Sequence, residues 1–175
     1  MIFSTRVPEI NRSLRLVILH PLPLYAEAIH AVIHRSSPWQ IIATTTDTDA
    51  AVAAARDADA ILFDTRWDTA AEIATLARRL REDCPGRSLV LLTRHEGVPL
   101  LRAAAGAGIN AVVHLCESVP TISSALAAVA CGNEFRSPVI AGRLARAEER
   151  RRQVARPVRD TSSGTFSRYG IAMGS

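Results

Sequence analysis

Short apolar runs alternate with longer polar and apolar mixtures along most of this chain. The runs are rich in branched residues and too short for helices, so they predict buried strands. The longer segments carry apolar residues at helical spacing and often start at a capping residue or a proline. Strands are expected at 14–19, 39–45, 60–63, 88–92 and 110–113. Helices are expected at 23–33, 47–56, 69–81, 98–107 and 118–131.

The strict alternation of strand and helix predicts the fold class. Continuous apolar strands between amphipathic helices are typical of a parallel sheet that is covered on both faces. The expected architecture is therefore α/β, a doubly wound five-stranded parallel sheet with helices on both faces. In such folds, ligands and chemistry lie at the carboxyl ends of the strands, so the residues that follow each strand are the candidates for function.

The alternation covers residues 14–137, which we interpret as one domain. Residues 1–13 precede it as an N-terminal arm. Residues 138–156 have a weak apolar stripe and predict a linker helix. Residues 157–175 are dominated by Ser, Thr, Gly and Arg without periodicity, which predicts a disordered tail.

Individual helix predictions are also specific. Asp47 or Asp49 is expected to cap the second helix, and Ile73, Leu76 and Leu80 to form the apolar side of the third. The apolar stripe of the first helix is expected to contain Leu24, Ala28, Ile29, Val32 and Ile33.

All 21 basic residues of the chain are arginine, and there is no lysine. This excludes enzymes that form a Schiff base through a lysine amine. It also excludes P-loop nucleotidases and protein kinases, which place a lysine on the phosphates. No enzymatic activity is expected.

The positive charge belongs to the C-terminal segment. Residues 1–140 hold 13 arginines and 14 acids, whereas residues 141–175 hold 8 arginines and 3 acids. The body is therefore close to neutral, and we do not expect this chain alone to bind DNA. A weaker hypothesis is direct DNA binding by residues 141–175. The run Arg150-Arg151-Arg152 is interpreted first as a solvated helix face.

The three cysteines, Cys84, Cys116 and Cys131, lack paired or metal-binding spacing, which favours a reducing, cytoplasmic location. Cys116 lies close to His114 in sequence and suggests redox chemistry, but a small buried side chain is the simpler interpretation. No apolar run approaches the length of a membrane span.

Several segments in order resemble the response-regulator receiver domain, most closely that of NarL/LuxR-type transcription regulators. Pro23-Leu24-Tyr25 resembles the start of the family's first helix. Ala58–Asp64 resembles the strand with the phosphate acceptor, and Leu91-Leu92-Thr93 the strand with the phosphate-contacting hydroxyl. Ala127–Pro138 resembles the last helix and the turn after it. The chain lacks a readable helix-turn-helix after this domain.

The resemblance gives each strand end an expected role. Asp64 takes the position of the phospho-acceptor and Thr93 that of the phosphate-contacting hydroxyl. His20 and Pro21 stand where the family has an acidic pair that holds Mg²⁺, and Leu115 stands where it has a lysine. The resemblance thus implies an atypical receiver domain. Normal Mg²⁺-dependent phosphorylation is not expected from it, no cofactor is expected, and Mg²⁺ binding is doubtful.

Alternatives stay open at this level. Asp64 is a working phospho-acceptor if an unusual cation such as Arg94 or His20 replaces the lysine, in which case a histidine kinase is the expected partner. His20, His95 and His114 form a less favoured metal site. The resemblance otherwise implies a protein partner or a homodimer that uses the face from Val98 to Ala130.

Overall fold

The computed structural model describes residues 13–36, 38–64 and 69–155. The expected N-terminal arm (apart from Ser13) and C-terminal tail lie outside the described residues. The strands are β1 (Arg15–Leu19), β2 (Gln40–Thr45), β3 (Ala60–Phe63), β4 (Ser88–Thr93), β5 (Ala111–His114) and β6 (Phe135–Arg136). The helices are α1 (Pro23–Ser36), α2 (Thr48–Ala55), α3 (Ala70–Asp83), α4 (Val98–Gly106), α5 (Val119–Ala130) and α6 (Pro138–Ala155).

The strands form one parallel sheet in the order β2-β1-β3-β4-β5-β6. The doubly wound α/β fold is confirmed, but the predicted number of five strands is wrong. The sixth strand has only two residues, Phe135 and Arg136, which pair with Ala111 and Val112 of β5. It is too short to produce a readable apolar run, and only pairing with β5 makes it a strand.

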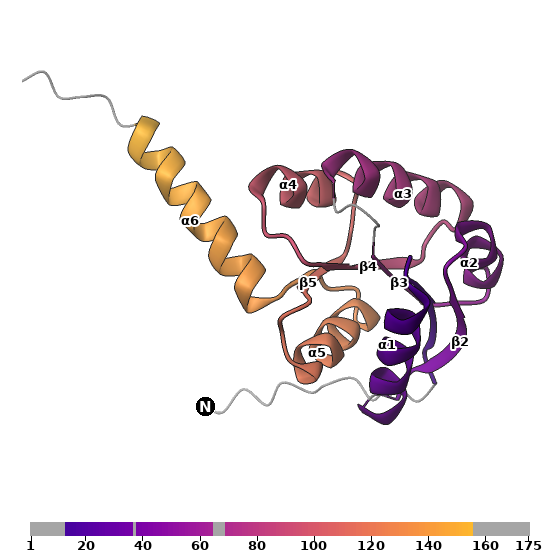
Figure 1. Cartoon of the computed structure of the whole chain (residues 1–175). Helices are drawn as coiled ribbons and strands as arrows, with labels where there is room; N and C mark the ends of the chain where they lie inside the picture. Colours follow the sequence, from indigo (N-terminus) through magenta and orange to yellow (C-terminus); the bar gives the residue numbers. More distant parts are fainter. Residues whose placement is uncertain (1–12, 37, 65–68, 156–175) are drawn as a thin grey trace, which may run out of the picture.

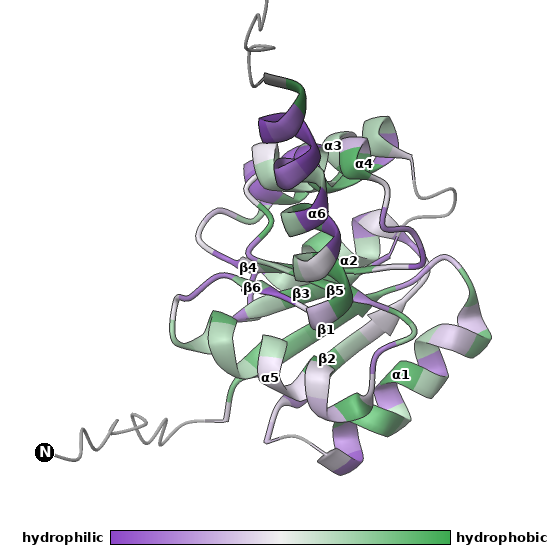
Figure 2. Cartoon of the chain, turned by 90° about the vertical axis from the view of Figure 1, so that its left-hand side faces the viewer, coloured by the Kyte–Doolittle hydropathy of each residue, from purple (hydrophilic) through white to green (hydrophobic). Residues whose placement is uncertain are grey.

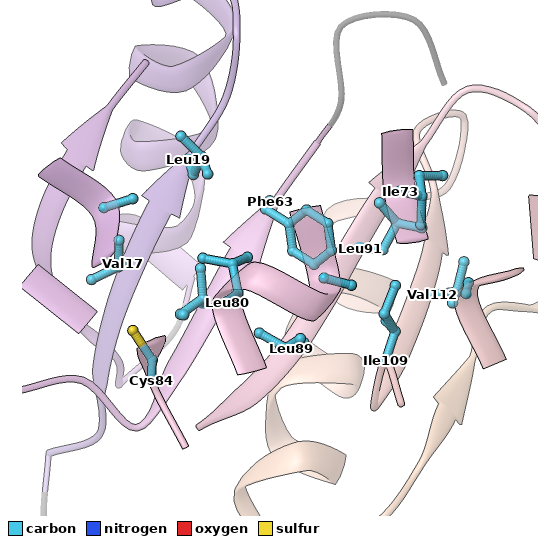
Figure 3. Close-up of a cluster of buried hydrophobic side chains, with 14 of the residues drawn as sticks. Val17, Leu19, Phe63, Ile73, Leu80, Cys84, Leu89, Leu91, Ile109 and Val112 are labelled. Carbon is cyan, nitrogen blue, oxygen red and sulfur yellow. The ribbon is translucent and has the colours of Figure 1, made fainter. Parts of the chain in front are cut away.

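Helices cover both faces of the sheet, with α3 and α4 on one side and α1 and α5 on the other (Figure 1). Because strand side chains alternate between faces, each strand contributes to two cores. Val17, Phe63 and Leu91 point to the side of α3, where Ile73 and Leu80 pack on them (Figure 3). The core on the other face contains Leu16, Ile18, Leu62, Val90, Leu92 and Leu126, among others.

Most local helix signals act as expected. The Asp47 side chain accepts a hydrogen bond from the Ala50 N–H at 2.7 Å and caps α2, and the Thr69 hydroxyl caps α3. In α3, Ile73 and Leu80 are fully buried, and Leu76 packs beside them.

The predicted apolar stripe of α1 is wrong in part. Ile29, Val32 and Ile33 are at least partly buried, but Ala28 is exposed and the Leu24 side chain is 74% exposed. Ala26, one turn of helix before Ile29, is buried instead. Ala26, Ile29 and Ile33 follow the spacing of one helix face, so the sheet selects a stripe rotated from the predicted one.

Helix α6 contributes to the hydrophobic core through its first turns. Ile140 is fully buried and Leu144 packs beside it against the core that α3 and α4 also cover. The rest of the helix extends away from the body (Figure 1), and its outer part is strongly hydrophilic (Figure 2). Within the residues that the structure describes, no helix has the length and apolar character needed to span a bilayer.

Candidate functional site

The ends of β1 and β3 lie side by side at the point where the strand order reverses. Leu19 pairs with Phe63 in the parallel register, so the next residues, His20 and Asp64, are neighbours. The Asp64 N–H donates to the Leu19 carbonyl at 3.1 Å, and the His20 N–H donates to the Thr45 carbonyl at 3.1 Å. Both residues are therefore fixed by sheet-like hydrogen bonds at the edge where doubly wound folds carry their sites.

His20 and Asp64 form a buried pair. The His20 Nε2 lies 3.1 Å from the Asp64 Oδ2, and their side chains are 4% and 2% exposed. The N–H bond is not aligned for a regular hydrogen bond to this oxygen. The short separation nevertheless places the ring's polar edge against the carboxylate, in a place from which solvent is excluded.

The hydrogen bonds of His20 assign its proton. The Leu22 N–H donates to the His20 Nδ1 at 3.1 Å. A neutral imidazole that accepts at Nδ1 carries its hydrogen on Nε2, the atom that faces Asp64. The ring is also stacked on Tyr25, with centroids 5.3 Å apart and planes at 4°. The loop backbone and α1 therefore hold the ring in place.

The described residues at this edge do not fit a magnesium ion. Mg²⁺ requires oxygen ligands, and protein sites for it use carboxylates. His20 presents a ring N–H to Asp64, and Pro21 has no ligand atom in its side chain. Among the described residues, no group of three His, Cys, Asp or Glu side chains is arranged to hold a metal ion. The hypothesis of a metal site formed by His20, His95 and His114 is therefore not supported either.

Thr93 lies at the end of β4, next to β3, and is fully buried. Its hydroxyl donates to the His95 carbonyl at 3.1 Å and accepts from the His95 N–H at 3.0 Å. The only hydroxyl proton is thus used within the chain's own turn. Contact with a phosphoryl oxygen as a donor would require that this hydrogen bond be broken.

Leu115 follows β5, and its N–H donates to the Thr93 carbonyl at 2.8 Å. Its side chain is half-buried and packs against the core that α1 and α5 cover. The preceding His114 has its Nε2 at 2.9 Å from the Arg94 carbonyl and its Nδ1 at 2.9 Å from the Cys116 sulfur. Neither position supplies the flexible cation that a lysine would provide.

The interpretation of Cys116 as a buried side chain is wrong. Cys116 and Cys131 are exposed, and Cys84 is the buried thiol. Burial raises the pKa of the Cys84 thiol, so this side chain behaves as part of the core. Cys116 lies in a turn after β5, where a polar neighbour, His114, replaces the apolar contacts that its residue type suggested.

The sequence analysis did not predict the direct contact between His20 and Asp64, although the sequence contains a signal for it. Both residues come directly after apolar strands, and both strands precede helices. Their contact depends on β1 and β3 being neighbours, which the local pattern does not state. Asp64, Thr93, His20 and Pro21 lie on the expected edge of the sheet, and Leu115 follows a strand that ends at the same edge.

The sequence matches no protein-family model and no curated protein, but solved structures resemble the fold. The isolated receiver domain of RcsB from Salmonella enterica serovar Typhimurium, solved with a phosphomimetic beryllofluoride, has 18% identity and a TM-score of 0.66; the match covers 75% of this chain and 99% of that one. A LuxR-family two-component response regulator from an Aurantimonas species has 22% identity and a TM-score of 0.69, over 79% of this chain and 99% of that one.

A third similar structure is the complex of the response regulator RcsB with DNA, at 19% identity and a TM-score of 0.69, where the match covers 79% of this chain and 71% of that one. These similarities show that the chain has the fold of response-regulator receiver domains. The expected fold class is thereby confirmed by independent structures as well as by the strand order.

Proposed function

We propose that this chain is an atypical receiver domain that acts in signal transduction and transcriptional regulation through protein–protein contacts, without normal Mg²⁺-dependent phosphorylation. The observation that carries the proposal is the 3.1 Å contact between the His20 Nε2 and the Asp64 Oδ2 inside a buried pair. The receiver fold of the similar structures supports the signalling role.

The buried pair opposes phosphoryl transfer to Asp64. The transfer requires a carboxylate oxygen to attack phosphorus while the bond between phosphorus and the donor's leaving group breaks. Asp64 is only 4% exposed, and the His20 ring lies against one of its oxygens. The attack would therefore require His20 to move away, against its stacking on Tyr25 and its hydrogen bond from the Leu22 N–H.

The surrounding residues provide little stabilisation for a transferring phosphoryl group. Thr93 uses its proton on the His95 carbonyl, and Leu115 has an apolar side chain. Loss of a single preorganised donor typically lowers a rate by about 10²–10³-fold. The absence of a carboxylate pair and a lysine together should make the reaction slower still.

A second candidate function is that of a two-component receiver, phosphorylated on Asp64, of a DNA-binding transcriptional regulator. The placement of Asp64 at the end of β3, beside the strand that carries Thr93, favours this candidate. A histidine kinase would be the phosphoryl donor. Asp64 would then become the acceptor only after the His20 ring has left it.

The test is incubation of the full chain with acetyl phosphate and Mg²⁺, read by intact-protein mass spectrometry. We expect no phosphoryl adduct on the wild-type chain. The variant that combines His20→Asp, Pro21→Asp and Leu115→Lys restores the acidic pair and the lysine, and it should gain an adduct that Asp64→Asn removes. A stoichiometric adduct on wild-type Asp64 would establish the second candidate instead.

The folded state of the triple variant must be checked, because it adds charge near a buried edge. Circular dichroism serves this purpose. If the triple variant does not fold, the wild-type reaction alone decides, and its outcome is a direct measurement on Asp64.

The expected contact face, from Val98 to Ala130, is not fully open. Ile140 and Leu144 of α6 pack against the core next to α4 and thus occupy one side of this face. Val119, at the start of α5, remains 36% exposed. We propose that a protein partner or a second copy of the chain uses the α5 side of this face.

A further inference from the structure

A groove of about 230 Å³ lies between α4 and α6, away from the strand ends. Its walls are mainly arginine: Arg102 comes from α4, and Arg143, Arg146 and Arg150 come from α6. The remaining lining residues are Val98 and Ala147, so no acidic side chain contributes. The groove therefore concentrates four guanidinium groups without an opposite charge.

Several arginines outside the groove have partners. Elsewhere in the described chain, Arg15 contacts Asp57, Arg79 contacts Asp49 and Asp83, and Arg136 contacts Glu134. Arg81 and Arg87 donate to backbone carbonyls. The four groove arginines form no ion pair or hydrogen bond among the described residues.

One groove donor is buried without an acceptor. The Nε of Arg143 is inaccessible to solvent and has no hydrogen-bond partner. A buried donor without a partner is destabilising. The Nε of Arg87 is also buried without a hydrogen-bond partner. The cavity beside Arg87, however, is lined by Asp57 and Asp59 as well as by arginines. Among the described residues, Arg143 thus joins an unsatisfied donor to a groove that has no acidic lining residue.

The two helices bring these arginines to one groove, where Arg102, Arg146 and Arg150 are exposed. Arg143, Arg146 and Arg150 recur at intervals of three and four residues, so they share one face of α6. Ile140 and Leu144 anchor the same helix in the core, and Arg102 lies one turn after Val98 on the facing helix. The two helices are in contact, and side chains of both line the groove. The charges are therefore brought together by packing.

We propose that the groove between α4 and α6 binds an anion that carries at least two phosphate groups. Guanidinium groups bind phosphate oxygens through paired N–H donors, which suits arginine better than lysine. A phosphate group carries roughly 1.5–2 negative charges at neutral pH, so about two such groups balance four arginines. The site is independent of Asp64 and of whether that residue accepts a phosphoryl group.

The same chemistry occurs in small polyphosphates and in the phosphate backbone of nucleic acid. The small volume of the groove and its position between two helices favour the small ligand. The simplest probe is inorganic pyrophosphate. Binding to the full chain is measured by isothermal titration calorimetry near physiological ionic strength, beside orthophosphate and a short DNA duplex. We expect saturable binding of one pyrophosphate per chain, tighter than that of orthophosphate.

Two double variants with equal charge loss test the location. The combination Arg102→Ala with Arg146→Ala removes groove residues from both helices, and we expect it to weaken pyrophosphate binding at least tenfold. The control is Arg151→Ala with Arg152→Ala, two exposed residues on α6 that do not line the groove. This control should change the affinity by less than about twofold, since exposed charges that do not line the groove are screened by solvent and salt.

Thermal unfolding gives a second readout. Pyrophosphate should raise the melting temperature of the wild-type chain and of the control, but not that of the groove variant. The proposal is overturned if pyrophosphate gives no saturable binding, or if both double variants weaken it equally. The proposal is also overturned if the chain binds only the DNA duplex and both double variants lower the affinity for the duplex equally. That result would mean that the arginines of α6 bind nucleic acid.

Discussion

At the scale of single residues, the contact between His20 and Asp64 decides what the strand ends can do. Each residue is ordinary for a strand end, but together they place a neutral imidazole N–H against a buried carboxylate. His20 also accepts a hydrogen bond from the Leu22 backbone and stacks on Tyr25. Its ring therefore has both an electrostatic role and a packing role at this edge.

The substitution His20→Ala should lower the free energy of unfolding by about 1–3 kcal/mol. It removes a buried ring and leaves the Asp64 carboxylate and the Leu22 N–H without this neighbour. Urea unfolding at mildly basic pH, where an exposed histidine is neutral, measures the loss. The control is His34→Ala on the exposed side of α1, for which we expect less than about 0.5 kcal/mol. Equal effects of the two substitutions would contradict a structural role for the pair.

At the scale of elements, α6 is both part of the domain and an extension from it. Its first turns contribute Ile140 to the core, whereas Val154 near its end is 87% exposed. This division explains why the sequence gives only a weak apolar stripe for the helix. A few apolar residues suffice to dock it, and the arginines that follow form the wall of the groove with α4.

The substitution Ile140→Ala should therefore cost about 2–5 kcal/mol in the free energy of unfolding, because it leaves a cavity in a closed core. Val154→Ala on the same helix shortens a side chain that is exposed to solvent. It should therefore leave the free energy of unfolding almost unchanged. Denaturant unfolding followed by circular dichroism compares the two. A negligible effect of Ile140→Ala would mean that α6 is not docked in solution.

At the scale of the whole molecule, the sheet places one candidate site at the strand ends, and the proposed contact face lies around β5. RcsB dimers bound to DNA are among the structures with this fold. In the present chain, Ile140 and Leu144 of α6 pack beside α4, so the proposed association through this face would use α5. Val119 is the exposed large apolar side chain of α5.

We expect the wild-type chain to form a homodimer that Val119→Asp weakens by at least tenfold. An acid in the first turn of a helix is favourable for the helix itself, so the substitution should act on association and not on folding. Sedimentation velocity across a range of concentrations measures the equilibrium, with Val154→Asp as the control on α6. A wild-type chain that stays monomeric at all concentrations would contradict the homodimer and leave a different protein as the partner.

Features of this chain that depend only on residues close together in sequence could be predicted from the sequence. The sequence by itself determined the alternation of strands and helices, because apolar runs and helical spacing reflect burial of neighbouring residues. It also placed Asp64 and Thr93 at strand ends, and it excluded lysine chemistry. It misplaced the buried stripe of α1, since that stripe depends on how the helix meets the sheet.

Only the tertiary structure decided how distant segments meet. The sixth strand exists because Phe135 pairs with Ala111, and the His20–Asp64 contact exists because β1 and β3 are neighbours. The arginine groove likewise requires α6 to pack on α4, over 40 residues later in the chain. Such contacts depend on strand order and helix docking, which arise from packing of the whole core and leave no periodic signal in any one segment.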